Sequence, residues 1–222
     1  MQKKKQTNSN MKLYKQFILL MAILVAGTLQ AQVSSQKILD DLAEKTNAAQ
    51  NIKVGFSYEM VNEEADIHEK TEGSLIVSGD KYVLNIAGQE IICDGKTIWT
   101  YIADANEVQI NEVDIDNSFS PTKLFSSYSD DYSAHLEKEY SENNRSYYLM
   151  KLKPKDKDSG FDYVHLKIEK DKMQLAAFIL YDFDNNEFSY LIKEYFTDIA
   201  LSNNTFSFDA SKYAGVDIID MR

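Results

Sequence analysis

SSQKILDDLAEKTNAAQNIKVGFSYEMV, residues 34–61, contains the change of hydrophobic period that decides the fold class. Its first half carries apolar residues at helical spacing, with Ser34 or Ser35 available as the N-cap. The apolar positions of that half are Ile38, Leu39, Leu42, Ala43 and Ala49. From Ile52 onward, apolar and polar residues alternate as they do in a strand. This stretch therefore predicts one amphipathic helix that leads directly into an amphipathic strand.

Strand-like segments then follow one another about every 8 to 12 residues, a spacing that favours an antiparallel sheet over βαβ units. They are EGSLIVS, KYVLNI, QEIIC, TIWTYIA, NEVQINEV, AHLEKEY, YYLMKLK, YVHLKIE, LAAFILYDF, EFSYLIKEYF and a closing FSF. Several are separated by turn-forming pairs such as Gly79-Asp80 and Asp94-Gly95. The segments share no linker or low-complexity interruption, so residues 32–222 are expected to form a single domain.

The segment SFSPTKLFSSYSDDY, residues 118–132, interrupts this series of strands. Pro121 suits the first helical position after a serine cap. The residues that recur on one face of this helix are Leu124, Phe125, Tyr128 and Tyr132. A second short helix is therefore expected in the middle of the sheet. Two amphipathic helices would cover one face of such a sheet. We expect a mainly β fold with helical additions, an unclosed, strongly twisted antiparallel β-barrel of about eleven strands with a helical lid.

The first 31 residues contain five lysines and no acidic residue, and the lysines precede the apolar run FILLMAILVA at residues 17–26. This order is typical of a secretory signal peptide. The apolar run has about half the length that a membrane-spanning helix needs. We therefore predict a signal peptide over residues 1–31, with cleavage after Ala31. No cysteine near that position can receive a lipid, so the mature protein is expected to be soluble in the periplasm and not lipid-anchored.

The charge of the chain excludes two classes of partner. Removal of residues 1–31 would take five of the 24 basic residues, leaving 19 against 35 acidic residues and a net charge of −16. Nucleic acids and anionic membrane surfaces attract clustered lysine and arginine, so neither is an expected partner. A basic partner protein suits this charge better.

Residues that carry enzymatic chemistry form no recognisable motif in the sequence. His68, His135 and His165 have no metal-ligand spacing, and Cys93 lies in the apolar run EIIC, where a buried, unreactive thiol is expected. DFDNNE at residues 182–187 has glutamate where a calcium loop needs glycine, so it is interpreted as a hairpin turn. The sequence also lacks a nucleophile elbow, a phosphate-binding loop and a dinucleotide fingerprint. We expect a protein that is not an enzyme and holds no metal or cofactor.

The hexapeptide DGKTIW at residues 94–99 resembles a signature of the periplasmic outer-membrane lipoprotein carriers, the LolA-like family. The surrounding order is similar as well, with EGSLIV at residues 72–77, SPTKLF at residues 120–125 and LKPKDKDSGF at residues 152–161. The end of the chain, from FSF to GVDIID at residues 206–220, resembles the closing segment of the family. The resemblance covers nearly the whole mature chain in order.

The resemblance implies an unclosed antiparallel barrel, lidded by helices, whose apolar cavity takes the acyl chains of lipoproteins. It also implies a monomeric periplasmic chaperone that receives acylated lipoproteins from an ATP-driven release complex of the inner membrane and delivers them to an outer-membrane acceptor. An acyl chain of about 16 carbons gains more than about 10 kcal/mol on leaving water, so such cargo needs a carrier. Two alternatives stay open: a carrier or sensor of another envelope lipid on the same fold, and an envelope hydrolase.

Candidate lining residues for this cavity come from the first helix, the strands and the lid helix. They are Leu39, Leu42, Phe56, Tyr58, Met60, Tyr82, Leu84, Trp99, Leu124, Phe125 and Tyr128. Strand alternation defines two faces without showing which one is concave, and Trp99 fits a core position equally well.

One position departs from the family pattern. The resemblance implies an arginine in the turn after the L-x-V strand, where it bonds to the lid and keeps the cavity closed. Here residues 77–81 read VSGDK, with Lys81 and no arginine. A lysine supplies a weaker, single-point contact, so the closing mechanism is expected to differ.

Overall fold

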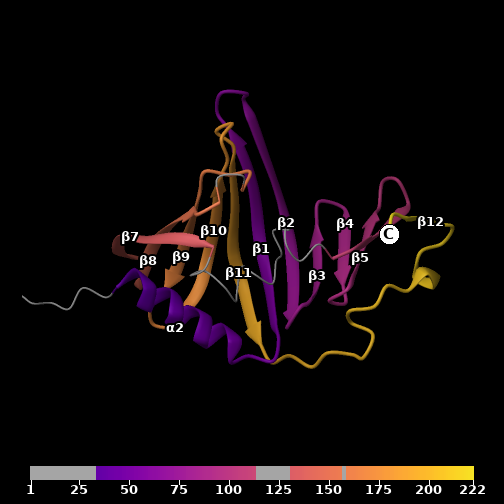
Figure 1. Ribbon diagram of the computed structural model, residues 1–222, viewed down its shortest axis with the longest axis horizontal. Coiled ribbons are helices and arrows are strands. Elements are labelled where there is room, and N and C mark those ends of the chain that lie inside the picture. Colours follow the sequence, from indigo (N-terminus) through magenta and orange to yellow (C-terminus); the bar gives the residue numbers. More distant parts are fainter. Residues whose placement is uncertain (1–33, 114–130, 157–158) are drawn as a thin grey trace, which may run out of the picture. The chain divides into compact units, whose positions relative to one another are not determined.

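The computed structural model describes residues 34–113, 131–156 and 159–222 (Figure 1). The signal peptide predicted over residues 1–31 and the lid helix predicted around residues 120–128 lie outside these ranges, so both stay predictions. The domain boundary at residue 32 stays a prediction for the same reason. Within the described ranges, no helix is long and apolar enough to cross a membrane.

Most of the described chain forms a single sheet of twelve strands in the order β12-β6-β5-β4-β3-β2-β1-β11-β10-β9-β8-β7. The strands are β1 (Ile52–Asn62), β2 (Ile67–Ser78), β3 (Lys81–Ile86), β4 (Gln89–Cys93), β5 (Thr97–Ile102), β6 (Glu107–Glu112), β7 (Tyr132–Glu142), β8 (Arg145–Pro154), β9 (Tyr163–Glu169), β10 (Gln174–Tyr181), β11 (Glu187–Thr197) and β12 (Asp217–Asp220). Neighbours are antiparallel except β12 and β6, which are parallel. The two edge strands do not pair with each other, and the strands change direction strongly across the sheet (Figure 1). The predicted unclosed, mainly antiparallel fold is confirmed. Tyr132, expected on the face of the second helix, is instead the first residue of β7, where it pairs with Pro154 of β8.

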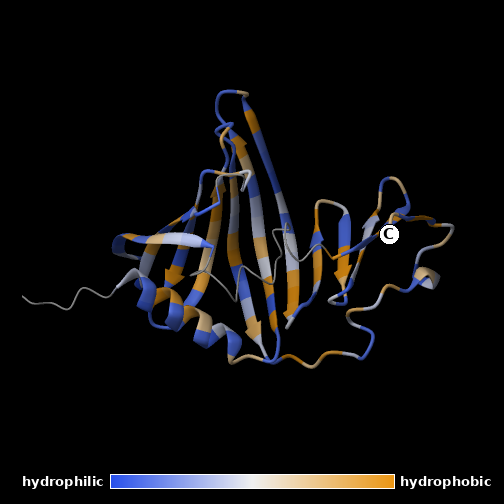
Figure 2. Cartoon of the chain, in the orientation of Figure 1, coloured by the Kyte–Doolittle hydropathy of each residue, from blue (hydrophilic) through white to orange (hydrophobic). Residues whose placement is uncertain are grey.

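The helix α2 (Ser35–Asn47) precedes the sheet and corresponds to the helix predicted at the start of the mature chain. Its buried face contains Ile38, Leu39 and Leu42, and the opposite face is mostly exposed and carries charges of both signs. Hydropathy alternates across the helix and along the strands (Figure 2). At its first residue, the Ser35 hydroxyl accepts a 2.9 Å hydrogen bond from the backbone N–H of Leu136 in β7. This bond and the apolar face hold α2 against the sheet.

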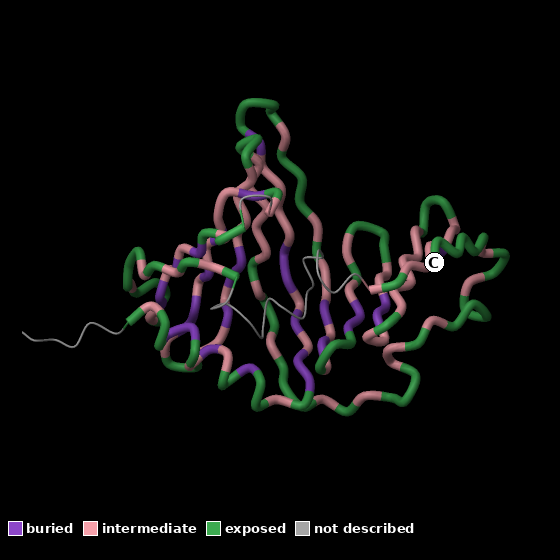
Figure 3. The backbone as a smooth tube through the Cα atoms, in the orientation of Figure 1, coloured by how far each residue is buried: buried purple, intermediate pink, exposed green. Residues whose placement is uncertain are grey.

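The largest cluster of buried side chains joins α2 to strands from both halves of the sheet. Its strand members include Val77 of β2, Tyr82 of β3, Met150 of β8 and Leu166 of β9. Side chains from strands so far apart can meet around a helix because the sheet curves around them. We call the face that carries this cluster the concave face, and the other the convex face. Figure 3 shows buried residues along the strands and on one side of α2, and exposed residues in most of the turns.

The end of the chain differs from the sequence prediction. The predicted closing strand FSF is wrong, because Phe206–Phe208 lies in a turn region rather than in a strand. Turn hydrogen bonds of 3.1 Å from Thr205 N to Ser202 O and of 3.2 Å from Ser207 N to Asn204 O use the backbone there. After the short 3₁₀ helix η2 (Ala210–Lys212), the chain forms β12 instead. The described sheet has twelve strands, close to the expected number of about eleven.

Amide side chains tie together the tips of the β1–β2 and β10–β11 hairpins. Asn62 Nδ2 donates to Asp184 O at 3.2 Å and to Asn186 Oδ1 at 2.7 Å, while its Oδ1 accepts from Ala65 N at 2.9 Å. In turn, Asn186 donates from its side chain to Asp182 Oδ2 at 2.7 Å. DFDNNE is thus a hairpin turn, as predicted, and Asn62 is buried against it.

Replacing Asn62 with alanine is expected to lower the free energy of unfolding by about 1 to 3 kcal/mol, because Ala65 N and Asp184 O lose a partner at a part-buried site. Urea denaturation of the full chain measures this change. The exposed Asn203 provides a control, whose replacement with alanine should change stability by less than about 0.5 kcal/mol. Equal effects of the two substitutions would contradict the structural role of Asn62.

Candidate functional site

The concave face carries a row of uncharged side chains that crosses seven neighbouring strands, from β2 to β7. The strand pairing places them directly opposite one another, so they share one face. The row consists of Thr71, Tyr58, Tyr190, Phe178, Leu166, Met150 and Leu136. A surface of this composition suits contact with an apolar chain and offers little to a charged ligand.

A second row lies one step closer to the hairpin tips. It consists of Glu69, Met60, Phe188, Leu180, Val164, Leu152 and Ala134. Its one charged member, Glu69, is exposed at the β2 end. Met60, Phe188 and Leu180 are half-buried, in contrast to the buried Val164 and Leu152. The middle of this row therefore presents apolar surface that a ligand can reach.

Tyr190 of β11 is the centre of an aromatic group on this face. Its ring centroid lies 5.6 Å from that of Phe56, 5.1 Å from Tyr58 and 6.0 Å from Phe178, with tilted or edge-on planes. These are favourable arrangements for aromatic pairs. Burial, with a smaller effect from the neighbouring Tyr58, raises the pKa of Tyr190 to about 12. The hydroxyl therefore stays neutral at physiological pH, and the aromatic group introduces no charge into the face.

Phe56 is held flat against the sheet because Gly73 stands opposite it on β2. A Cβ atom at Gly73 would lie 2.4 Å from Phe56 Cζ, a distance that real contacts do not reach. The missing side chain of Gly73 thus leaves the space that the Phe56 ring occupies.

Most of the predicted lining residues share the concave face, in two groups. Leu39, Leu42, Phe56 and Tyr82 are buried, whereas Tyr58, Met60 and Leu84 are half-buried. All except Met60 belong to the buried cluster around α2 or pack against it. Leu124, Phe125 and Tyr128 lie outside the described residues. Their part in a lining stays a prediction.

Trp99 faces away from the other candidates. It stands opposite Ile92 of β4 and Ile110 of β6, whereas its neighbour Ile98 stands opposite Cys93, a member of the concave cluster. A one-residue step along a strand moves a side chain to the other face. Trp99 therefore lies on the convex face, and a cavity on the concave face does not include it.

The strands β10 and β11 contribute concave residues that the sequence analysis did not select. They are Phe178, Leu180, Phe188, Tyr190, Ile192 and Tyr195. The alternation in EFSYLI indicates the first part of this set. Beyond it, the pairing shifts between Gly55 and Phe56, which leaves Lys193 opposite no residue of β1. This bulge places Ile192 and Tyr195 on one face despite their spacing of three, a result that alternation alone does not predict.

The signature DGKTIW begins with a side chain that builds a turn. The Asp94 carboxylate accepts hydrogen bonds from the backbone N–H groups of Lys96 at 2.9 Å and Thr97 at 2.8 Å. Burial acts to raise the pKa of Asp94, but these bonds and the positive charge of Lys81 outweigh it and lower the pKa. Lys81, in the turn where the resemblance implies an arginine, thus acts on Asp94 of the neighbouring hairpin. The motif fixes the β4–β5 turn.

Cys93 is a buried free thiol, as predicted, with 1% of its surface exposed. Its Sγ accepts a 3.3 Å hydrogen bond from Gly95 N, and burial raises the pKa of the thiol. A buried thiol in its neutral form is a poor nucleophile. In the described ranges, no group of three or more His, Cys, Asp or Glu side chains is arranged to hold a metal ion.

On the convex face, a β-bulge in β7 brings Glu137 against His165 of β9. The pairing skips from Leu136 to Lys138, and Glu137 Oε2 lies 3.0 Å from His165 Nε2. The atoms are close enough for an ion pair but are not aligned for a hydrogen bond. Burial lowers the pKa of His165, opposed by Glu137 and assisted by Lys151. The imidazole is therefore held in its neutral form inside the folded protein.

This arrangement predicts a pH dependence of stability. The unfolded chain binds a proton at His165 near the ordinary pKa of 6.5, whereas the folded protein binds it only at lower pH. Stability from this residue is therefore complete above pH 6.5 and is lost as the pH falls below it. His165→Gln should flatten the fall in the free energy of unfolding between about pH 7 and pH 5. The exposed His135→Gln is the control, and identical pH profiles for the two variants would refute the assignment.

Comparison with known proteins identifies similar sequences over most of the chain. Residues 47–209 match the family described as "Outer membrane lipoprotein carrier protein LolA". An outer-membrane lipoprotein carrier protein of Histophilus somni is 24% identical over 212 residues, which cover 94% of this chain and 98% of the relative. One of Francisella tularensis subsp. novicida is 23% identical over 200 residues, covering 85% and 90% of the two chains.

Among solved structures, an uncharacterized conserved protein of Thermus thermophilus is similar, with a TM-score of 0.57. The match covers 83% of this chain and 98% of that one at 11% sequence identity. At this sequence identity, the similarity shows a shared fold and says nothing about the ligand.

Proposed function

Because the chain belongs to the outer membrane lipoprotein carrier protein (LolA) family, we propose that it is a soluble periplasmic chaperone that binds the acyl chains of lipoproteins and carries them from the inner to the outer membrane. The observation that carries this proposal is the uncharged row across seven strands of the concave face. Export by a signal peptide over residues 1–31 is part of the proposal, as is the absence of catalytic activity.

The two groups of concave residues have different roles in this proposal. The half-buried Tyr58, Met60 and Leu84 contact the acyl chains, together with Phe188 and Leu180 from the second row. The buried residues support that surface from α2 and the strands; they are Leu39, Leu42, Phe56 and Tyr82. Leu124, Phe125 and Tyr128 complete the lining from the segment between β6 and β7.

The energetics of such a site fit a carrier that must also release its cargo. Each methylene removed from water contributes about 0.8 kcal/mol. Part of the concave surface is already covered by α2 and by aromatic contacts such as Tyr58 with Tyr190. An acyl chain that replaces existing contacts gains less than its full transfer free energy. Binding is therefore strong enough for transport and weak enough for delivery.

The proposed partners follow from the same role. Acylated lipoproteins are the cargo, an ATP-driven release complex of the inner membrane is the donor, and an outer-membrane acceptor receives the cargo. A mature net charge of −16, from 19 basic and 35 acidic residues, favours basic docking surfaces on both of these partners. The carrier acts as a monomer in this scheme.

Native mass spectrometry of the protein purified from the periplasm tests the nature of the cargo. We expect a bound lipoprotein. A bound phospholipid or glycolipid in its place would instead favour a carrier or sensor of another envelope lipid. Turnover of a panel of esters and glycosides would favour an envelope hydrolase.

Met60→Glu is expected to lower the affinity for a diacylated lipopeptide at least about tenfold, because it puts a charge into apolar surface that the acyl chains cover. Val61→Glu is the matched control, since Val61 is the next residue of β1, is also half-buried and faces the convex side. Titration of a fluorescent lipopeptide measures both. Equal losses in the two variants would contradict binding on the concave face.

Leu124→Glu or Phe125→Glu is expected to abolish acyl binding while leaving the unfolding transition of the sheet unchanged, because both residues are proposed to belong to the lid and not to the sheet. The same titration and a urea denaturation curve measure the two properties. Unchanged lipopeptide affinity would remove these residues from the proposed lining.

A further inference from the structure

The upper half of β2 has an open edge. β3 pairs with residues 73–78 of β2, whereas β1 pairs with residues 67–77. Residues Ile67–Glu72 therefore pair on one side alone among the described strands, as Figure 1 shows where β2 rises past the shorter β3 and β4. Within the described ranges, no strand pairs with the backbone N–H and C=O groups on the other side, which are the groups that an additional strand would use.

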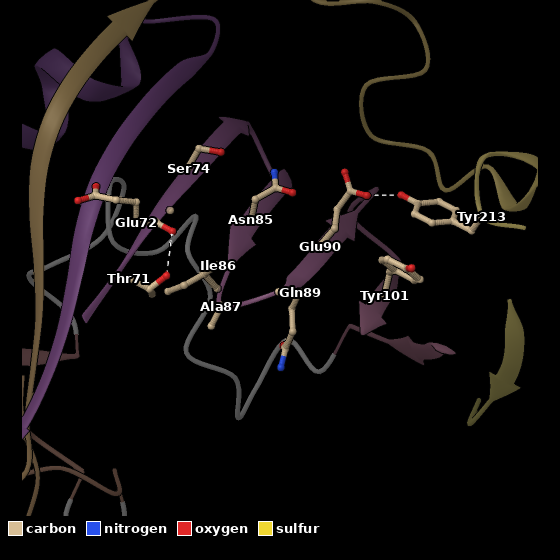
Figure 4. Close-up of a pocket in the computed structure, with 12 residues that line it drawn as sticks. Thr71, Glu72, Ser74, Asn85, Ile86, Ala87, Gln89, Glu90, Tyr101 and Tyr213 are labelled. Atoms are coloured by element: carbon tan, nitrogen blue, oxygen red, sulfur yellow. Dashed lines mark hydrogen bonds between the residues drawn. The ribbon is translucent and has the colours of Figure 1, made fainter. Parts of the chain in front are cut away.

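A cleft of about 520 Å³ begins at this edge. It lies between the β2 residues Thr71–Ser74 and the β3–β4 hairpin at Asn85–Glu90 (Figure 4). Tyr213 stands on its far side, where its hydroxyl donates to Glu90 and its ring lies 4.3 Å from the ring of Tyr101. The C-terminal segment thus supplies a fixed wall to the cleft.

The chemistry of the cleft suits a polypeptide and not an acyl chain. Its polar lining side chains are Thr71, Glu72, Ser74, Asn85, Gln89 and Glu90. A hydrocarbon chain would leave these groups without water or partners, which is unfavourable. An extended peptide has a hydrogen-bond donor and acceptor at almost every residue. It can therefore bond both to these polar side chains and to the open edge of β2.

The cleft reaches the concave face at its β2 end. By the strand register, other lining side chains belong to the convex face; they are Glu72, Ser74, Asn85, Glu90 and Tyr101. Thr71 is the last member of the uncharged row that contains Tyr58, and Gly73 stands opposite Phe56. Ile86, at the end of β3, packs against the buried cluster. A chain whose acylated end lies on the concave face therefore meets the open edge of β2 where the apolar surface ends.

We propose that the open edge Ile67–Glu72 binds, as an added antiparallel or parallel strand, the extended polypeptide that follows the acylated end of a cargo lipoprotein. This inference rests on the proposed function and adds a second subsite to it. Pairing through the backbone gives affinity without selecting a sequence. One carrier can thereby hold many different lipoproteins in the same way.

A second copy of this chain is the competing occupant of the edge. His68, Glu69, Lys70 and Glu72 place charged or titratable side chains along it, on alternating faces of the strand. Charges on an edge strand oppose its association with another folded sheet. They allow a single flexible peptide to add, because its side chains can turn toward solvent.

Hydrogen exchange of the full chain tests the location of the subsite. The probes are a dipalmitoylated cysteine and the same lipid followed by a peptide of about ten residues, the length of a long strand. The lipopeptide should slow exchange in residues 67–72 at least about tenfold, and the lipid alone should not. The edge strands β7 and β12 are internal controls and should not change.

Two further lipopeptides test the backbone pairing itself. Each carries N-methyl groups on alternate peptide residues, and the two differ by one position. Successive N–H groups of a strand point to opposite sides, so only one of the two lipopeptides has its N-methyl groups on the side that faces β2. That lipopeptide should lose at least about tenfold in affinity, and the other should match the unmodified lipopeptide. Equal binding by both, with exchange in residues 67–72 unchanged, would overturn the inference while leaving acyl binding intact.

The remaining outcomes separate the two proposals. Failure to bind either the lipid or the lipopeptide would overturn the proposed function, and this inference with it. Protection of residues 67–72 that rises with protein concentration in the absence of lipid would assign the edge to a second copy and overturn the peptide subsite.

Discussion

The pairing of β1 with β11 is the interaction on which the rest of the structure depends. β1 to β6 follow one another across one half of the sheet, and β7 to β11 across the other, so this pair alone joins the halves through the described strands. Its bulge at Lys193 keeps Phe56 and Ile192 on the same side as Val54 and Tyr195. The concave face is continuous because of that single extra residue. Without it, half of β11 would present the opposite set of side chains.

Local pattern predicts the elements of this fold better than their orientation. The change of period near Ile52 and the alternation of the later segments predict α2 and nearly every strand, because both signals lie within a few residues. The facing of Trp99 and of Tyr195 depends on register and on a bulge, which are set by distant partners. FSF has the alternation of a strand, yet turn hydrogen bonds occupy its surroundings. The open edge of β2 exists because β3 is shorter than β2, and no sequence motif predicts that difference in length.

The concave face carries mostly uncharged side chains, many of them aromatic. Tyrosines supply much of its area, and burial raises the pKa values of Tyr82 and Tyr190 to about 12, so their hydroxyls carry no charge. Family membership and the uncharged row that contains Tyr58 and Tyr190 both support an apolar ligand, and the two observations are independent. Lys81, in the turn where the resemblance implies an arginine, acts on Asp94.

The parallel strand β12 makes the sheet depend on residues that are far apart in the sequence. Its residues 217–220 cover the backbone edge of β6, which is formed from residues 107–112. The edge of β6 therefore stays uncovered until a segment about 110 positions later lies beside it. The β1–β11 pair has the same property, since Ile52 pairs with Thr197. Contacts between such distant residues form slowly, so the complete sheet is expected to form more slowly than its individual hairpins.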